Sequence, residues 1–307
     1  MNFGRRYLLA IVLFAIGFVS PIAAKLQVVT TTSHVADLVA NVAGDRVELK
    51  SLMGPGVDPH LYKATARDVM TLQRADLVFY SGWLLEGRLT DTLEKMKSRG
   101  KVVHAVAEKV SKEKLLSSED YVDHYDPHTW FDPELWATTV EVVVEALSEL
   151  DAENANTYKA NGEEYRKQIL DLAEWTKAKI LEIPESRRFL VTSHDAYNYF
   201  GRAFGIQVIG VQGLSTATEA GLADVSKTVD FIKKNEIPAI FVESSVSPAT
   251  INSISKQSGA VVGGELFSDA LGAPGETHTI SGGVSYEVGT YIGMFKYNVD
   301  TIVNALK

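Results

Sequence analysis

Short apolar runs alternate with longer amphipathic segments along most of the chain. The short runs are rich in Val, Ile and Leu, a composition that is typical of buried β-strands. These predicted strands lie at residues 26–32, 47–52, 77–80, 101–105, 189–193, 207–211, 239–242 and 260–263.

The segments that follow the apolar runs have helical spacing. Their apolar residues recur every three or four positions, as in a helix that is buried on one face. These predicted helices lie at residues 34–43, 65–74, 89–97, 197–204, 221–234, 248–257 and 286–305. Because strands that alternate with helices form parallel βαβ units, the pattern predicts an α/β fold.

The middle of the chain lacks strand-like runs and predicts two consecutive helices. Pro133 suits the first turn of a helix over residues 135–150. Residues 154–182 contain no proline, and Pro184 ends the segment. A helix of about 28 residues spans some 40 Å, which is long enough to join two lobes. The sequence therefore predicts two βα lobes with parallel sheets, joined by a long backbone helix. The first lobe is expected at residues 25–150, the helix at 151–183 and the second lobe at 184–307.

The first 24 residues have the features of a cleavable signal peptide. Arg5 and Arg6 form a basic start, and the apolar run at residues 7–19 is shorter than the ~20 residues that span a bilayer. Small residues then lead to Ala24, after which cleavage is expected. An uncleaved N-terminal anchor is the alternative. We expect export of the mature chain to a Gram-negative periplasm.

Cysteine content and charge narrow the class of protein. The chain has no cysteine, and a lipid-anchored protein needs one at its cleavage site, so the sequence predicts a periplasmic protein with no lipid anchor. Any metal site must then use His, Asp or Glu side chains. The formal net charge of −9 and the lack of a basic cluster argue against nucleic acid as a partner.

Three of the seven histidines occupy comparable loop positions. His60 and His194 follow predicted strands, and His128 precedes a predicted helix. Ligands of open α/β sheets bind beyond the carboxyl ends of strands, so these loops are expected to face one cleft. Imidazole is a common metal ligand, and Asp269, after the last predicted strand, supplies an anionic fourth group. Taken singly, each residue is also typical of caps and turns, and no compact motif such as H-E-x-x-H occurs.

The segments around these four residues carry a family resemblance. They are G-P-G-V-D-P-H at 54–60, D-P-H-T-W-F-D at 126–132, T-S-H-D-A-Y at 192–197 and F-S-D at 267–269. With A-I-F-V-E-S at 239–244 and a closing helix at 291–306, they occur in the order seen in TroA-like and ZnuA-like metal receptors of ABC transporters. The sequence resembles this family over essentially the whole mature chain.

The resemblance implies a fold, a site and a partner. It implies two βα lobes on a backbone helix, with one metal ion held between them by His60, His128, His194 and Asp269. The expected role is capture of the ion and delivery to the permease of an ABC importer in the inner membrane. The resemblance implies no catalytic residue and no organic cofactor, and we expect a monomer.

The metal is expected to be Zn²⁺ or Mn²⁺. Relatives that prefer manganese or iron often have Glu at the third ligand position, so His194 favours zinc or mixed use of zinc and manganese. Zinc-specific relatives often carry a long His-rich loop, whereas residues 110–126 are short and hold only His124. His124 is either an auxiliary metal contact or a solvated loop residue.

The sequence leaves two alternative functions possible and does not decide the roles of several polar residues. A zinc hydrolase would need an open coordination position and a base such as Glu243 or Asp195. Either acid could instead accept a hydrogen bond from a ligand imidazole. A metal-binding surface adhesin of the same fold is the other alternative. The remaining histidines have structural interpretations. We expect His34 to lie in the first turn of a helix, His104 to be packed or hydrogen-bonded in a strand, and His278 to be exposed.

Overall fold

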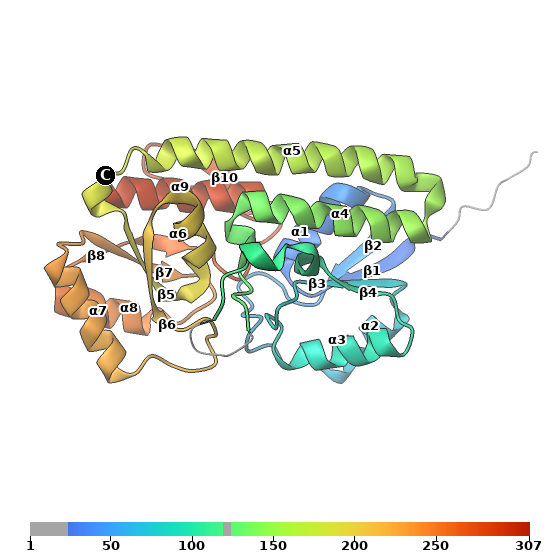
Figure 1. Cartoon of the computed structure of the whole chain (residues 1–307), viewed down its shortest axis with the longest axis horizontal. Helices are drawn as coiled ribbons and strands as arrows, with labels where there is room; N and C mark the ends of the chain where they lie inside the picture. Colours follow the sequence, from blue (N-terminus) through green and yellow to red (C-terminus); the bar gives the residue numbers. More distant parts are fainter. Residues whose placement is uncertain (1–23, 119–123) are drawn as a thin grey trace, which may run out of the picture.

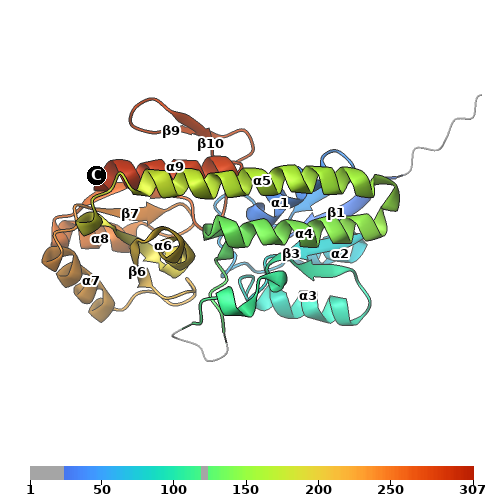
Figure 2. The same ribbon diagram turned by 45° about the horizontal axis from the view of Figure 1, so that its top comes forward.

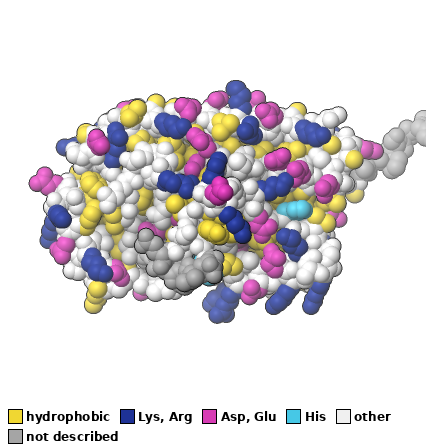
Figure 3. All heavy atoms as spheres, viewed as in Figure 1, with side chains coloured by type: hydrophobic (Ala, Val, Ile, Leu, Met, Phe, Trp, Pro, Cys, Tyr) yellow, Lys and Arg dark blue, Asp and Glu magenta, His cyan; other side chains and the backbone are white. Residues whose placement is uncertain are grey.

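The computed structural model describes residues 24–118 and 124–307. The predicted signal peptide, residues 1–24, therefore lies outside the described residues apart from Ala24. Within the described ranges, no helix is long and apolar enough to cross a membrane. On the face drawn in Figure 3, acidic and basic side chains are interspersed over both halves of the molecule.

The first lobe is built on a parallel four-stranded sheet in the order β2-β1-β3-β4. Val28 of β1 and Phe79 of β3 face the main core, whereas the neighbouring Val29 and Val78 face a second core under α2 and α3. Helices therefore bury both faces of this sheet, which explains the nearly continuous apolar runs of its strands. The elements are β1 (Leu26–Thr30), α1 (Ser33–Ala43), β2 (Val47–Ser51), α2 (Ala66–Arg74), β3 (Leu77–Tyr80), α3 (Arg88–Ser98) and β4 (Val103–Ala105).

The second lobe repeats the βα pattern with two parallel strand pairs. β5 pairs with β6, β7 pairs with β8, and β5 and β7 contact each other (Figure 1). Val191 and Ile240 from these strands pack against Ile232 and Ile251 from the covering helices. The elements are β5 (Phe189–His194), α6 (Asn198–Phe204), β6 (Gln207–Gln212), α7 (Leu222–Lys234), β7 (Ala239–Glu243), α8 (Ala249–Ser258) and β8 (Val261–Leu266).

A long helix, α5 (Ala155–Ile180), runs along one side of both lobes (Figures 1 and 2). It packs on α1 and α4 (Pro133–Leu150) of the first lobe and on α9 (Tyr291–Leu306), which covers the second. Gly162 allows the close approach to α4, because a Cβ at this position would lie 2.5 Å from Val144 Cγ2. The predicted architecture of two βα lobes on a backbone helix is confirmed, and its boundaries at residues 25–150, 151–183 and 184–307 stay a prediction.

One predicted helix is shorter than expected, because its start belongs to a hairpin. β9 (Thr277–Thr279) and β10 (Ser285–Glu287) pair antiparallel and extend beyond the second lobe (Figure 2). The helix predicted from residue 286 therefore begins at Tyr291, where the Thr290 side chain accepts a hydrogen bond from the Gly293 N–H. Single turns of 3-10 helix connect other elements at Val106–Lys109, Lys112–Lys114, Thr129–Phe131, Ala152–Asn154, Glu185–Arg187 and Asp195–Tyr197.

Candidate metal centre

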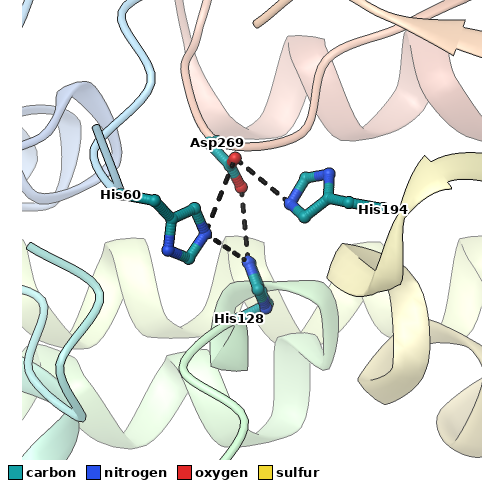
Figure 4. Close-up of side chains that lie close together, drawn as sticks. All are labelled: His60, His128, His194 and Asp269. Carbon is teal, nitrogen blue, oxygen red and sulfur yellow. Dashed lines mark hydrogen bonds and ion pairs between the residues drawn. The ribbon is translucent and has the colours of Figure 1, made fainter. Parts of the chain in front are cut away.

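The four residues singled out in the sequence meet at one point between the lobes (Figure 4). One ligand atom from each lies within 4.8 Å of the others. His60 comes from the loop after β2 and His128 from the segment before α4, both in the first lobe. His194 is the last residue of β5, and Asp269 lies in the loop after β8. The cleft between the lobes therefore contains donors from both of them.

The two first-lobe histidines are placed by the same local device. Asp58 Oδ1 accepts a hydrogen bond from the His60 backbone N–H at 2.8 Å. Asp126 Oδ1 accepts one from the His128 backbone N–H at 2.9 Å. In each Asp-Pro-His segment, the aspartate thus closes a turn on the residue two positions later. The repeated tripeptide orients both imidazoles toward the cleft.

A glycine permits the approach of a second loop to His60. Gly87 has φ +49°, and a Cβ there would lie 3.1 Å from the His60 carbonyl oxygen. A side chain at this position would be strained by its backbone conformation and would push against the His60 backbone. Gly87 therefore helps to fix the depth at which His60 enters the site.

The separations of the donor atoms match the size of a tetrahedral site. His60 Nε2 and His128 Nε2 are 3.2 Å apart, and His194 Nε2 lies 3.2 Å from Asp269 Oδ2. Asp269 also lies 3.5 Å from His128 Nε2 and 3.9 Å from His60 Nε2. Bonds of about 2.0–2.1 Å to one ion place tetrahedral ligands roughly 3.3 Å apart. The four groups are therefore spaced for one small cation.

Buried polar atoms without well-aligned hydrogen bonds also point to a cation. His194 Nε2 and both carboxylate oxygens of Asp269 make no hydrogen bond of good geometry among the described residues, although His194 Nε2 lies 3.2 Å from Asp269 Oδ2. Both side chains are fully buried. Burying such groups is costly, and a cation at the centre would satisfy all of them. The donor set of three imidazoles and one carboxylate fits a divalent transition metal.

Two carboxylates orient the imidazoles of His128 and His194 from behind. Asp126 Oδ1 lies 2.7 Å from His128 Nδ1, and Glu243 Oε2 lies 2.7 Å from His194 Nδ1. Glu243 also accepts a hydrogen bond from the His194 backbone N–H at 2.9 Å. Because Nδ1 faces a carboxylate in both residues, Nε2 faces the centre. Asp195, the other acid considered in the sequence, instead accepts a hydrogen bond from the Gly210 N–H.

Asp126 was missed by sequence reasoning, although a signal for it exists. It precedes His128 by two residues, and the same spacing recurs between Asp58 and His60. A carboxylate two positions before a metal-ligand histidine can reach either its backbone N–H or its ring. The repeated Asp-Pro-His tripeptide could therefore have identified Asp126 as a hydrogen-bond partner of His128.

Burial and charge set the protonation of the site. Burial lowers the pKa of His60 to about 3, so this imidazole is neutral at pH 7. Burial also opposes charge on His194, but Glu243 and Asp269 outweigh it and raise its pKa well above the usual value. Burial alone would raise the pKa of Asp269, but the three histidines outweigh it and hold that pKa far below its usual value. Without metal, the site therefore pairs a protonated His194 with an ionised Asp269.

The other histidines lie outside the donor set. His34 is buried and stacks on Trp130, with ring centroids 4.7 Å apart. His104 is partly buried beside Phe79, and His278 Nε2 lies 2.8 Å from Glu276 Oε1. His124 lines a small pocket together with His60.

Two α/β lobes on a long helix, with a buried group of three histidines and one aspartate between them, are typical of a metal-binding receptor. The profile of the family described as ZnuA, the periplasmic component A of a zinc-uptake complex, matches residues 28–305. The chain therefore belongs to the ZnuA/TroA family of metal-binding, substrate-binding proteins. Proteins of this class are the solute-binding components of ABC transporters.

The names of two similar proteins mention different metals, manganese and zinc. The manganese-binding lipoprotein MntA of Bacillus subtilis is 43% identical over 288 residues, which cover 92% of this chain and 90% of MntA. The zinc-binding protein TroA of Treponema pallidum is 42% identical over 287 residues, which cover 92% of this chain and 89% of TroA. The solved structure of TroA superposes with a TM-score of 0.86 at 41% identity and covers 92% of this chain and 99% of TroA.

The expected localisation is corrected by these relatives. The sequence predicted a periplasmic receptor with no lipid anchor, but MntA and the SsaB protein of Streptococcus sanguinis are named as lipoproteins. SsaB, described as a metal ABC transporter substrate-binding lipoprotein, is 30% identical over 92% of this chain and 90% of its own length. The prediction rested only on the missing cysteine, and an absent residue gives no positive evidence for release from a membrane.

Proposed function

We propose that this chain captures one Zn²⁺ or Mn²⁺ ion with His60, His128, His194 and Asp269 and delivers it to the permease of an ABC importer. The main support is the convergence of the four donor atoms within 4.8 Å at a buried point between the lobes. Family membership and the names of MntA and TroA support the same function.

Removal of one ligand tests the site directly. We expect wild-type protein to bind one Zn²⁺ per chain in isothermal titration calorimetry. His128→Ala leaves a buried carboxylate, Asp126, without its imidazole and removes one of four ligands, so affinity should fall by more than about a hundredfold. His278→Ala is the control, because this histidine is not among the four donors and its Nε2 lies 2.8 Å from Glu276 Oε1. Wild-type affinity in His128→Ala would exclude His128 as a ligand.

The proposed activity is binding and not catalysis. A catalytic zinc site keeps one position open for water or substrate, whereas the four proposed donors would fill a tetrahedral site. The side chains of His128, His194 and Asp269 have no exposed surface, so no substrate reaches them in this arrangement. The zinc-loaded protein should therefore leave ester, peptide and phosphate substrates intact. Turnover that disappears in His128→Ala would contradict this proposal.

The choice between zinc and manganese needs a native sample. Three imidazoles and one carboxylate near tetrahedral spacing suit Zn²⁺, and the second oxygen of Asp269 offers a fifth ligand to Mn²⁺. Zn²⁺ generally binds more tightly than Mn²⁺ to the same nitrogen and oxygen ligands, so affinity alone does not identify the cargo. Elemental analysis of protein purified from its own cells, followed by competition of the two ions, decides this point.

We also propose that the receptor acts as a monomer. All four donors come from a single chain, so a second copy adds nothing to the site. Sedimentation of the metal-loaded protein should give one species of monomer mass. A dimer that dissociates when the metal is removed would contradict this proposal.

A further inference from the structure

His60 is the only one of the four proposed ligands that reaches the surface. Its side chain is 5% exposed, whereas those of His128, His194 and Asp269 are 0% exposed. A pocket of about 120 Å³ opens beside it. An ion that moves between solvent and the centre therefore passes His60. The residues around this pocket include Trp83, Leu84, Tyr125, Pro127 and Leu214.

The first-lobe wall of this pocket is firmly held. Trp83 and Leu84 have left-handed backbone conformations, with φ of 51° and 64°. Such conformations are unfavourable for large side chains and persist only where surrounding contacts impose them. Trp83 Nε1 donates a hydrogen bond to the Ala107 carbonyl at 2.9 Å, and its ring packs edge-on against Tyr125. This wall is therefore a poor candidate for movement.

The opposite wall belongs to the second lobe and has one polar anchor. Leu214 and Ser215 lie between β6 and α7, in a segment without helix or strand. The next residue, Thr216, donates a hydrogen bond from its hydroxyl to Asp58 Oδ2 at 2.5 Å. Among the described residues, this is the hydrogen bond that joins the His60 loop, residues 54–63, to the second lobe. The same aspartate holds the His60 backbone N–H through its other oxygen.

The far side of the site is tied by several bonds between the lobes. Trp130 Nε1 donates to the Ser268 carbonyl at 3.1 Å, and the Leu271 N–H donates to Ser33 Oγ at 2.8 Å. The Tyr291 hydroxyl donates to the Trp130 carbonyl at 2.7 Å. The loop that carries Asp269 is thus anchored on both sides of the carboxylate.

Beside the pocket, Asp126 accepts hydrogen bonds from Asn198 and Tyr199 of the second lobe. The His60 loop has only its bond to Thr216, so the Leu214 segment is the part of the pocket that separates most easily.

We propose that the metal ion enters and leaves past His60 through this pocket, and that the Thr216–Asp58 hydrogen bond is the latch that closes it. Thr216 is a positioning residue, because it holds the Leu214 wall and touches neither the ion nor its ligands. This inference rests on the proposed function. Since the latch lies outside the ligand set, its loss changes the rates of uptake and release more than the affinity.

Stopped-flow measurements with Zn²⁺ test the latch. The fluorescence of Trp130, whose ring lies 5.2 Å from that of His128, reports uptake, and mixing with excess EDTA reports release. In Thr216→Val, both rate constants should rise about tenfold while Kd changes less than about threefold, the effect of losing one hydrogen bond to a carboxylate. Thr216→Ser keeps the hydroxyl and should restore wild-type rates. Thr218→Val, an exposed residue of the same segment, should change neither rate.

Other results would overturn the latch. Unchanged rates in Thr216→Val would show that the bond does not control access, and faster release with unchanged uptake would assign Thr216 to support of the bound ligands. Thr216→Ser behaving like Thr216→Val would exclude the hydrogen bond as the cause. Thermal unfolding of each variant separates these effects from loss of the fold. Failure of the wild-type protein to bind Zn²⁺ would refute the proposed function itself, before any variant is compared.

Discussion

At the scale of single residues, the site combines imidazoles with different protonation. His60 is held neutral by burial, whereas Glu243 and Asp269 favour the charged form of His194. A histidine must lose its proton before Nε2 can bind a metal. Metal and proton therefore compete at His194.

This difference predicts proton release on binding. At pH 7 the metal-free site carries a proton on His194, so Zn²⁺ binding should release about one proton per chain. Affinity should fall as pH falls, by up to about tenfold for each pH unit below the raised pKa of His194. Calorimetry in buffers of different ionisation enthalpy measures the released protons. Binding with no proton release at pH 7 would show that His194 is neutral in the free protein.

Glu243→Gln provides the matched comparison for this prediction. The amide removes the charge that favours the protonated form of His194 but keeps a polar group of similar shape. The pKa of His194 should fall, and fewer protons should be released at pH 7. The same proton release in both proteins would assign the proton to another group.

At the scale of elements, helix α1 carries a buried histidine, His34, whose ring makes no hydrogen bond among the described residues. His34 lies in the first turn of α1 and stacks on Trp130. Burial lowers the pKa of His34 from 6.5 to about 3. Between these pH values the unfolded chain binds a proton that the folded chain does not, so folding stability falls as pH falls through this window.

Replacing His34 with phenylalanine should relieve this acid sensitivity. The aromatic ring can still stack on Trp130, but it has no proton to gain on unfolding. Below about pH 6.5, the free energy of unfolding of His34→Phe relative to wild type should rise by about 1 kcal/mol per pH unit. Urea unfolding of the metal-free proteins from pH 7 to pH 4 measures the difference. Parallel pH profiles would mean that His34 is not the group responsible.

At the scale of the whole molecule, α5 limits how far the lobes can move. Its 26 residues span about 39 Å and pack on helices of both lobes. Interlobe hydrogen bonds to Ser268 and Leu271 join the lobes a second time behind the site. A wide hinge opening would break these contacts, so opening is expected to be local and centred on the pocket beside His60.

Solution scattering tests this restriction. The radius of gyration should differ by less than about 1 Å between zinc-loaded and metal-free protein, since no large hinge closure takes place. The Thr216→Val variant should give the same small difference, because the latch moves one segment and not a lobe. A change of several ångströms would show that α5 bends or that the lobes rotate on it.

Much of this architecture follows from local sequence patterns. Runs such as Leu77–Tyr80 are apolar at every position because both faces of their sheet are buried, and such runs predict strands without knowledge of their partners. The proline-free stretch that ends before Pro184 likewise predicts α5 without knowledge of distant contacts, because helices form from interactions between neighbouring residues. The short motifs around His60, His128, His194 and Asp269 were sufficient to select these residues as candidate ligands.

Contacts between distant segments were decided only by the tertiary structure. The sequence alone did not pair Glu243 with His194 Nδ1, place His34 on Trp130, or join Thr216 to Asp58 across the cleft. The β9–β10 hairpin also escaped prediction, because its strands are short and exposed and carry little apolar alternation. Propensity and periodicity describe interactions within a few residues, whereas these contacts depend on how two lobes pack on one helix. The sequence by itself therefore determined the elements and the candidate ligands, and the packing of the lobes decided which polar groups contact those residues.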